Sequence, residues 1–309
     1  MEKFDASRIK TYSVKNRASK VSIEDISKPY HKGGSFKDFF SSLPNILASK
    51  HFKDVVAAIV RARRNDRPVM LGMGAHAIKV GLNPVIIDLM ERGVITSLSL
   101  NGAGIIHDFE LAYIGQTSED VDKEILSGSF GMAEETGSIL NEAIGSAKAD
   151  EGIGAAVGRM MHASDFPYKD KSLLAAGHRL GLPVTVHIAI GTDIIHMHPT
   201  FNGKATGNAT HRDFLTFCSL VSRLENGVYI NLGSAVLLPE IFLKAVTLVR
   251  NIGYPIRHLT TVNMDFSQHY RPNTNVVRRP TQGGGKGFAI TGHHEIMLPL
   301  LAAAIIEEM

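Results

Sequence analysis

The chain has no tryptophan and only one cysteine among its 309 residues. This single thiol, Cys218, cannot form an intramolecular disulfide or supply a zinc site that is built from several cysteines. The surrounding sequence FLTFCSLV has the apolar spacing of a helix. We therefore interpret Cys218 as a residue of the core.

Long hydrophobic runs are also scarce. The longest, IMLPLLAAAII at 296–306, is too short to span a bilayer and contains Pro299. The N-terminal sequence MEKFDASRIK is charged and lacks the apolar stretch of a secretory signal. The net charge of +3 gives no general case for a nucleic-acid binder. We expect a cytoplasmic protein that acts on a small molecule, with neither a membrane nor a nucleic acid as its partner.

What the chain does contain is a regular alternation of apolar patterns. Short runs typical of buried strands alternate with runs that have helical spacing. The expected strands lie at 67–73, 94–102, 182–190, 227–233 and 256–264. The expected helices lie at 78–93, 105–114, roughly 130–162, 213–224 and 240–251. Strands that alternate with helices pair in parallel. The sequence predicts an α/β fold with a Rossmann-like, doubly wound, mostly parallel sheet and helices on both faces.

The chain divides into two unequal parts. Residues 1–49 are expected to form an N-terminal arm and a helix, because the first 35 residues are polar and basic. We expect this arm to wrap either the domain or a neighbouring subunit. Residues 50–309 are expected to form a single Rossmann-like domain.

Glycine-rich or polar turns follow four of the expected strands, at 72–75, 101–104, 191–193 and 233–235. In a parallel α/β sheet, ligands bind beyond the carboxyl ends of the strands, and glycine lets them approach the backbone. The turn Gly72-x-Gly74-x-x-Ala77 matches the dinucleotide fingerprint loosely, but the next strand ends at Asn101 and not at an acidic residue. Together, the turns predict a small-molecule site.

Residues 266–294 show no periodicity and contain no Asp or Glu. Long irregular segments in a compact domain are typically functional or mobile. Here Lys286 lies among four glycines. A lysine held against buried backbone can act as a nucleophile that forms imines, whereas a flexible lysine in solvent has no such role.

Histidine is abundant, with fourteen residues. The sequence TDIIHMH places Asp193 close to His196 and His198, which are residue types that bind Zn or Fe. His107 and His196 are also candidate general bases. Each of these residues can equally be a hydrogen-bonded imidazole with no role in chemistry.

The order of motifs resembles deoxyhypusine synthase. NGAGIIHD at 101–108 is similar to the family's Thr-Thr-Gly-Ala-Asn-Ile-Val-His-Asp motif, and LGMGAHAIKVGL at 71–82 to its strand and glycine-containing helix. INLGSAV at 230–236 and VNMDFSQ at 262–268 resemble two later segments. Gly285-Lys286 and the apolar stretch MLPLLAA at 297–303 follow in the same order.

This resemblance implies a homotetramer that uses NAD and passes a group through an imine on Lys286. The residues that it would place in the NAD cleft are Gly102, Ala103, Gly104, Asp108, Gly233 and Ser234. The other candidate cofactor-binding residues are Gly72, Gly74, Asn101, Asp193, Asp265 and His293.

Two departures from the family change the expected substrate. The family has carboxylates before its lysine for spermidine, and a tryptophan that stacks on it, and both are missing here. Residues 266–294 instead carry Arg271, Arg278 and Arg279, which suit an anionic or carboxylate-bearing substrate. We therefore expect an NAD-linked transferase that works through a lysine imine but does not act on spermidine. The alternatives are a metal-dependent enzyme that uses Asp193, His196 and His198, or a non-catalytic nucleotide-binding scaffold.

Overall fold

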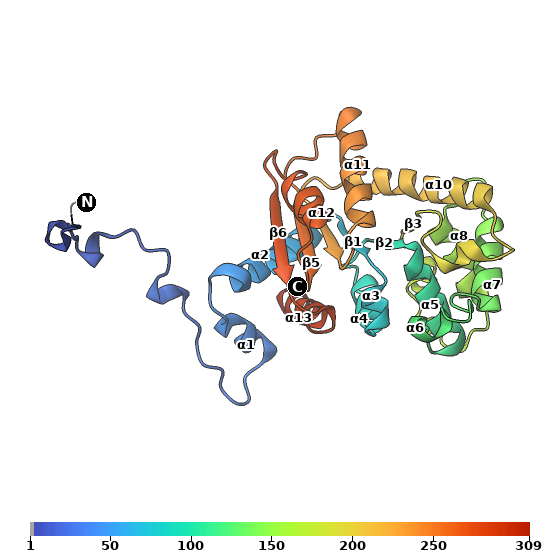
Figure 1. Cartoon of the computed structure of the whole chain (residues 1–309), viewed down its shortest axis with the longest axis horizontal. Coiled ribbons are helices and arrows are strands. Elements are labelled where there is room, and N and C mark those ends of the chain that lie inside the picture. The colour runs from blue at the N-terminus through green and yellow to red at the C-terminus, as the bar shows by residue number, and fades with distance from the viewer. Residues whose placement is uncertain (1–2) are drawn as a thin grey trace.

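The computed structural model describes residues 3–309. Residues 3–34 contain three short 3₁₀ turns, η1 (Ala6–Arg8), η2 (Val14–Asn16) and η3 (Ile23–Asp25), and none of these residues is buried. Figure 1 shows this segment extending away from the body of the molecule. We call residues 3–34 the arm. It does not wrap its own domain.

Within residues 3–309, the body is built on a six-stranded sheet in the order β3-β2-β1-β4-β5-β6, and every neighbouring pair is parallel. The strands are β1 (Val69–Met73), β2 (Ser97–Asn101), β3 (Val184–His187), β4 (Val228–Leu232), β5 (Thr260–Asp265) and β6 (Lys286–Thr291). Strands β1 to β5 are buried along nearly their whole length, because both faces of the sheet are covered. The predicted fold class is confirmed.

Helices on the two faces of the sheet enclose two apolar clusters. The larger cluster is supplied mainly by α2 (Leu47–Arg64), α4 (Asn83–Glu91), α5 (Gly102–Ile114), α7 (Glu134–Gly145), α8 (Ile153–Ala163), α9 (Leu173–Leu180) and α13 (His294–Glu308). The smaller cluster is supplied by α10 (Gly203–Val221), α11 (Leu237–Asn251) and the π-helical turn η6 (Asn273–Arg278). Short helices complete the chain: α1 (Phe36–Ser42), α3 (His76–Lys79), α6 (Val121–Glu124), η4 (Lys169–Lys171), η5 (Ile194–Met197) and α12 (Tyr270–Pro272).

Between β2 and β3 the chain forms a set of helices beyond one edge of the sheet (Figure 1). We call residues 102–180 the helical lobe. The arm leaves the body at the opposite end (Figure 1). These two parts of one chain are therefore well separated.

The segment 266–294 is not the irregular loop that was expected. It contains α12, η6 and the edge strand β6. Within β6, Phe288 and Ile290 are buried while their neighbours are exposed, which is the period-two pattern of a strand covered on one face. The expected boundary between residues 49 and 50 falls inside α2.

Among residues 3–309, no helix combines the length and the apolar character needed to cross a bilayer.

Candidate functional site

The strand order reverses between β1 and β4, where the turns that follow the two strands meet. The Gly74 N–H donates to the Leu232 carbonyl at 3.0 Å, and a Cβ on Gly74 would lie 2.6 Å from the Gly233 oxygen. Gly72 makes room for the buried Tyr229, whose hydroxyl would lie 2.5 Å from an added Cβ. The glycines at 72 and 74 therefore allow β1 and β4 to approach at the switch point, the usual ligand crevice of this architecture.

We call the place between the turns that follow β1 and β4 the crevice, and a histidine lies against it from the side of β6. His294 begins α13 and is only 1% exposed, yet neither ring nitrogen has a hydrogen-bond partner among residues 3–309. Its Nε2 lies 3.8 Å from Asp265 Oδ1, and its ring contacts His76 with centroids 5.3 Å apart. Burial lowers the pKa of His294, and the Asp265 carboxylate partly opposes that shift. Gly233, at a φ of +66°, has no Cβ because one would lie 2.5 Å from this ring.

Two buried asparagines hold the floor of the crevice. Asn231 Nδ2 donates to Asn263 Oδ1 at 2.7 Å and to the Ser234 carbonyl at 2.9 Å, while Asn263 donates to Gln268 at 2.8 Å. Asn231 Oδ1 is buried without a partner among the described residues. Ser234 Oγ accepts from the Leu238 N–H at 3.2 Å and so caps the first turn of α11. The N-termini of α11 and α13 both face this edge, where their free N–H groups favour an anion.

On the other side of the switch point, Asp193 lies against the N-terminus of α5. A Cβ on Gly102 would lie 2.1 Å from Asp193 Oδ2, so glycine is needed there for the carboxylate to approach. Burial raises the pKa of Asp193, although nearby His196 and the Ala103 N–H favour the charged form. His196 Nδ1 accepts from the Gly191 N–H at 3.1 Å, and its Nε2 is buried without a partner in residues 3–309, 4.0 Å from Asp193.

A cavity of about 220 Å³ opens next to Asp193. Its charged side chains are three carboxylates and one lysine: Glu110, Glu119, Asp193 and Lys79. Its remaining lining includes Ile106, His107, Ser118, Val121, Phe130 and Ile194. The cavity therefore combines an apolar wall with an excess of negative charge.

One histidine in this cavity is part of a hydrogen-bonded chain. His107 Nδ1 lies 2.6 Å from Thr117 Oγ1, and Thr117 donates its only proton to Glu110 Oε2 at 2.6 Å. The threonine oxygen must then accept from His107, so the imidazole carries its proton on Nδ1 and keeps a lone pair on Nε2. Burial, with a smaller contribution from Lys79, lowers the pKa of His107 to about 4. The ring is neutral near pH 7, and its Nε2 lone pair can accept a hydrogen bond.

Asp108 occupies a different place from the one that the family resemblance implied. It is fully buried and accepts from Asn83 Nδ2 at 2.9 Å, Ser172 Oγ at 2.6 Å and the Leu173 N–H at 2.8 Å. Its hydrogen bonds therefore tie α5 to α4 and cap α9. We assign Asp108 a structural role inside the protein, away from the cofactor cleft.

Lys286 also lies away from the crevice. It is exposed and pairs with Thr260 at the amino end of β5, whereas Asp265, at the other end of that strand, pairs with Thr291. Because all strands are parallel, Lys286 lies at the edge of the sheet formed by the amino ends of the strands, whereas the glycine turns lie at the edge formed by the carboxyl ends. A single subunit does not bring this lysine to them.

The three arginines do not form an anion pocket. All three are exposed. Arg271 lies 3.5 Å from Glu240, and Arg279 donates to Asn275 at 2.8 Å, while Arg278 ends η6. The prediction of an anionic substrate depended on these arginines lining the site. The cavity beside the crevice is instead lined by carboxylates.

The three expected metal ligands do not come together: Asp193 and His196 are neighbours, but His198 points elsewhere. His198 Nε2 lies 2.8 Å from the Gly131 carbonyl oxygen, and its ring packs on Gly137, so it faces α7. Across residues 3–309 there is no group of three His, Cys, Asp or Glu side chains that could hold a metal ion. His293 is exposed at the start of α13 and stacks on Phe266, with centroids 5.9 Å apart.

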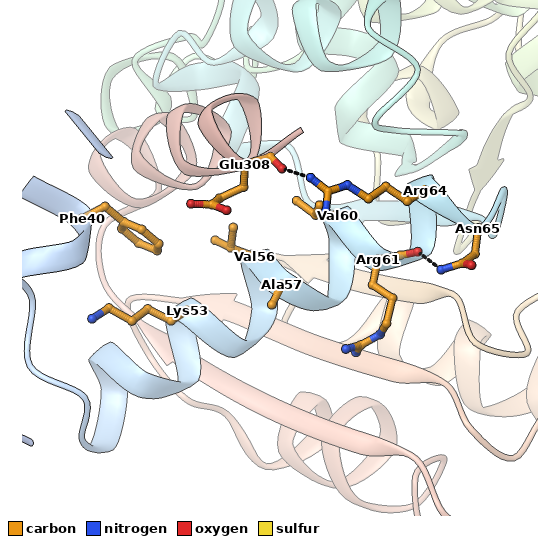
Figure 2. A pocket seen from close by; sticks show the side chains of 9 residues that line it. All are labelled: Phe40, Lys53, Val56, Ala57, Val60, Arg61, Arg64, Asn65 and Glu308. Atoms are coloured by element: carbon orange, nitrogen blue, oxygen red, sulfur yellow. Dashed lines mark hydrogen bonds between the residues drawn. The ribbon is translucent and has the colours of Figure 1, made fainter. Parts of the chain in front are cut away.

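A further cavity, of about 310 Å³, lies on the outer side of α2 between α1 and the end of α13 (Figure 2). Figure 2 shows Phe40, Val56 and Val60 around it, with Arg64 donating to the Glu308 carbonyl. None of its lining residues belongs to a turn that follows a strand. It is separate from the crevice.

The sequence analysis missed Asn231, Glu110 and Thr117. A weak signal was present for Asn231, because it is a polar residue inside an apolar strand. No local pattern predicts the contact between Thr117 and His107, because it depends on how the loop after α5 folds back on that helix.

Comparison with known proteins gives the fold and no closer relation. No protein-family model and no curated sequence matches the chain significantly. AgrE, solved as a ternary complex with ornithine and NAD+, is similar over 85% of this chain, with a TM-score of 0.55 and 15% identity. The match covers 34% of AgrE, so this chain spans about a third of that protein's length.

Two shorter structures are matched over more of their length. An LOR/SDH protein from Methanococcus maripaludis S2 has a TM-score of 0.52 and 14% identity, over 85% of this chain and 71% of its own. A candidate deoxyhypusine synthase from Entamoeba histolytica has a TM-score of 0.52 and 12% identity, over 91% of this chain and 96% of its own. At such identities the likeness establishes a shared fold. The resemblance to deoxyhypusine synthase is therefore supported as a distant relation of fold.

Proposed function

We propose that the protein is an NAD-linked enzyme that oxidises or reduces a small molecule bearing a positive charge. The crevice between the β1 and β4 turns would hold the dinucleotide, and the neighbouring carboxylate-lined cavity would hold the substrate. The observation that carries the proposal is the junction of Gly74 and Gly233 below the unpartnered ring of His294. NAD supplies the hydride acceptor when it is bound.

The residues of the crevice fit a dinucleotide. The N-termini of α11 and α13 lie beside the Gly233 turn and suit a pyrophosphate. Asp265 and His294 offer a carboxylate and a ring nitrogen for ribose hydroxyls. Asn101, at the end of β2, is neutral and cannot supply the carboxylate that usually binds the ribose. Buried polar atoms without partners are uncommon in folded proteins, and a ligand would satisfy those of His294 and Asn231.

The cavity favours a cationic substrate because its three carboxylates outnumber its one lysine. Opposite charges in a partly enclosed site attract more strongly than in bulk water. His107 would accept a hydrogen bond from the substrate on Nε2, while Thr117 and Glu110 hold the ring in that tautomer. This reverses the expected substrate charge, and the lowered pKa of His107 disfavours its expected role as a general base.

Calorimetric titration with NAD+ and NADH tests the cofactor directly. We expect saturable binding by the wild type and its loss in Gly233→Ala, whose methyl group would collide with His294. Gly145→Ala is the matched control, because it adds the same methyl group in open space on α7. A folded wild-type protein that binds neither form of the dinucleotide contradicts the proposal.

A lysine-imine step on Lys286 remains a separate hypothesis. It requires Lys286 of a second copy to reach the crevice, because the two lie at opposite edges of one sheet. Borohydride trapping in the presence of NAD+ and candidate amines tests it. A modified Lys286 peptide supports that step, and its absence from an active preparation removes it.

A further inference from the structure

The arm is an exposed segment that mixes large apolar and basic side chains. Its large apolar residues are 50% to 86% exposed: Phe4, Ile9, Tyr12, Val14, Val21, Ile23, Ile26 and Tyr30. Its backbone hydrogen bonds to later residues are Lys28 to Ser42 and Asn45 to Asp25, both near its end. Apolar side chains gathered on an extended segment gain stability only where another surface covers them.

A surface with complementary properties lies on the helical lobe. Residues 116–135, which we call the acidic segment, run from the end of α5 through α6 to the start of α7. Four large apolar residues in it are 42% to 87% exposed: Val121, Ile125, Leu126 and Met132. The acidic segment therefore has the same unusual mixture as the arm, with the opposite charge.

The net charges of the arm and of the acidic segment are equal in size and opposite in sign. The arm carries eight Lys and Arg against three Asp and Glu. The acidic segment carries six Asp and Glu against one Lys. In a chain with an overall charge of only +3, this separation is local and pronounced. Oppositely charged surfaces attract at long range and orient the partners before apolar contacts form.

We propose that the arm of one copy docks on the acidic segment of a second copy. A second copy is the occupant because the arm and the lobe lie at opposite ends of one chain (Figure 1). Apolar side chains of the arm pack on α6 and its flanking turns, and its lysines and arginines face the surrounding carboxylates. The association does not rest on NAD binding.

The docked arm covers the mouth of the carboxylate-lined cavity. Four of the residues that line this cavity belong to the acidic segment: Ser118, Glu119, Val121 and Phe130. A partner's arm on this segment shields the cavity from water and adds residues to its rim. The cavity is thus completed between subunits.

Zero-length carbodiimide cross-linking of a mixture of nitrogen-14 and nitrogen-15 copies tests this proposal. The reagent joins a lysine to a carboxylate that it touches, and the isotopes separate links between copies from links within one. We expect links from the arm lysines, such as Lys15 and Lys20, to Asp122 or Glu135, with about half of them joining unlike isotopes if exchange is complete. Raising the salt to about 0.5 M should reduce their yield.

Charge reversal provides the matched variants. Lys15→Glu with Lys20→Glu should abolish these links, and adding Asp122→Lys with Glu135→Lys should restore them with the charges exchanged. Lys204→Glu with Arg223→Glu alters two exposed cations on the body and should leave the links intact. Arm-to-lobe links confined to single copies, a folded protein without such links, or an arm that binds only nucleic acid overturns the proposal.

Discussion

The carboxylate of Asp213 gives a quantitative test of how the helical lobe is attached to the sheet. Asp213 lies in α10, is 2% exposed, and accepts from the Gly154 N–H at 3.0 Å and the Val186 N–H at 2.9 Å. It thereby caps α8 and holds β3. Gly152 is needed beside it, because a Cβ there would lie 2.0 Å from Asp213 Oδ1.

Asp213→Ala leaves two buried N–H groups without an acceptor. Each such loss costs about 1–3 kcal/mol, so we expect the free energy of unfolding to fall by about 2–6 kcal/mol. Urea unfolding followed by circular dichroism measures this value. Asp150→Ala, the same change at an exposed position whose side chain has no hydrogen-bond or ion-pair partner among residues 3–309, should alter the free energy by less than about 0.5 kcal/mol.

The pH dependence has a defined sign. Burial raises the pKa of Asp213 to about 7 from its ordinary 3.8, against the opposing effect of the N–H donors. Between about pH 4 and pH 7 the folded protein therefore keeps the proton on Asp213, whereas the unfolded chain has lost it. The stabilisation that Asp213 provides should be greatest below pH 4 and decline as the pH rises to about 7. A loss below about 1 kcal/mol in Asp213→Ala, or a difference from wild type that grows with pH, would refute this reasoning.

Three other outcomes follow from single residues. Lys286→Ala should leave NAD+ binding unchanged in calorimetry, because Lys286 lies at the opposite edge of the sheet, and a large loss of affinity would show that it reaches the crevice. Gly145→Ala should raise the free energy of unfolding by about 0.4–1 kcal/mol in urea titrations, because a methyl group there meets open space and restricts the unfolded chain. Nitrogen-15 NMR should show His107 neutral at pH 7 with its proton on Nδ1 and a pKa near 4, and Thr117→Val should remove that tautomer preference; a ring that titrates near 6.5 would contradict the buried hydrogen-bonded chain.

Much of the fold could be predicted from local patterns. The strands at 69–73 and 228–232 are largely apolar, the strand at 97–101 alternates serine with leucine, and a glycine-bearing turn follows each of them. Their alternation with helices predicts parallel pairing. The edge strand β6 was missed because glycines surround it and only Phe288 and Ile290 carry its pattern. The candidate site was harder to predict, because single residues such as Asn101, at the end of β2, and Asp193, in the loop after β3, are identifiable one at a time, whereas their partners come from distant segments.

Local sequence by itself determined the class of the protein: an α/β sheet, glycine-bearing turns at the carboxyl ends of its strands, and a basic leading segment. Those features depend on hydrophobic period and on the backbone freedom of glycine, which act over a few residues. Tertiary structure alone decided that Lys286 lies away from the turns, that Asp108 is internal, that the cavity is acidic, and that His294 lies over Gly233. Each of these depends on which segments meet in space, and the direction and order of six strands set those meetings.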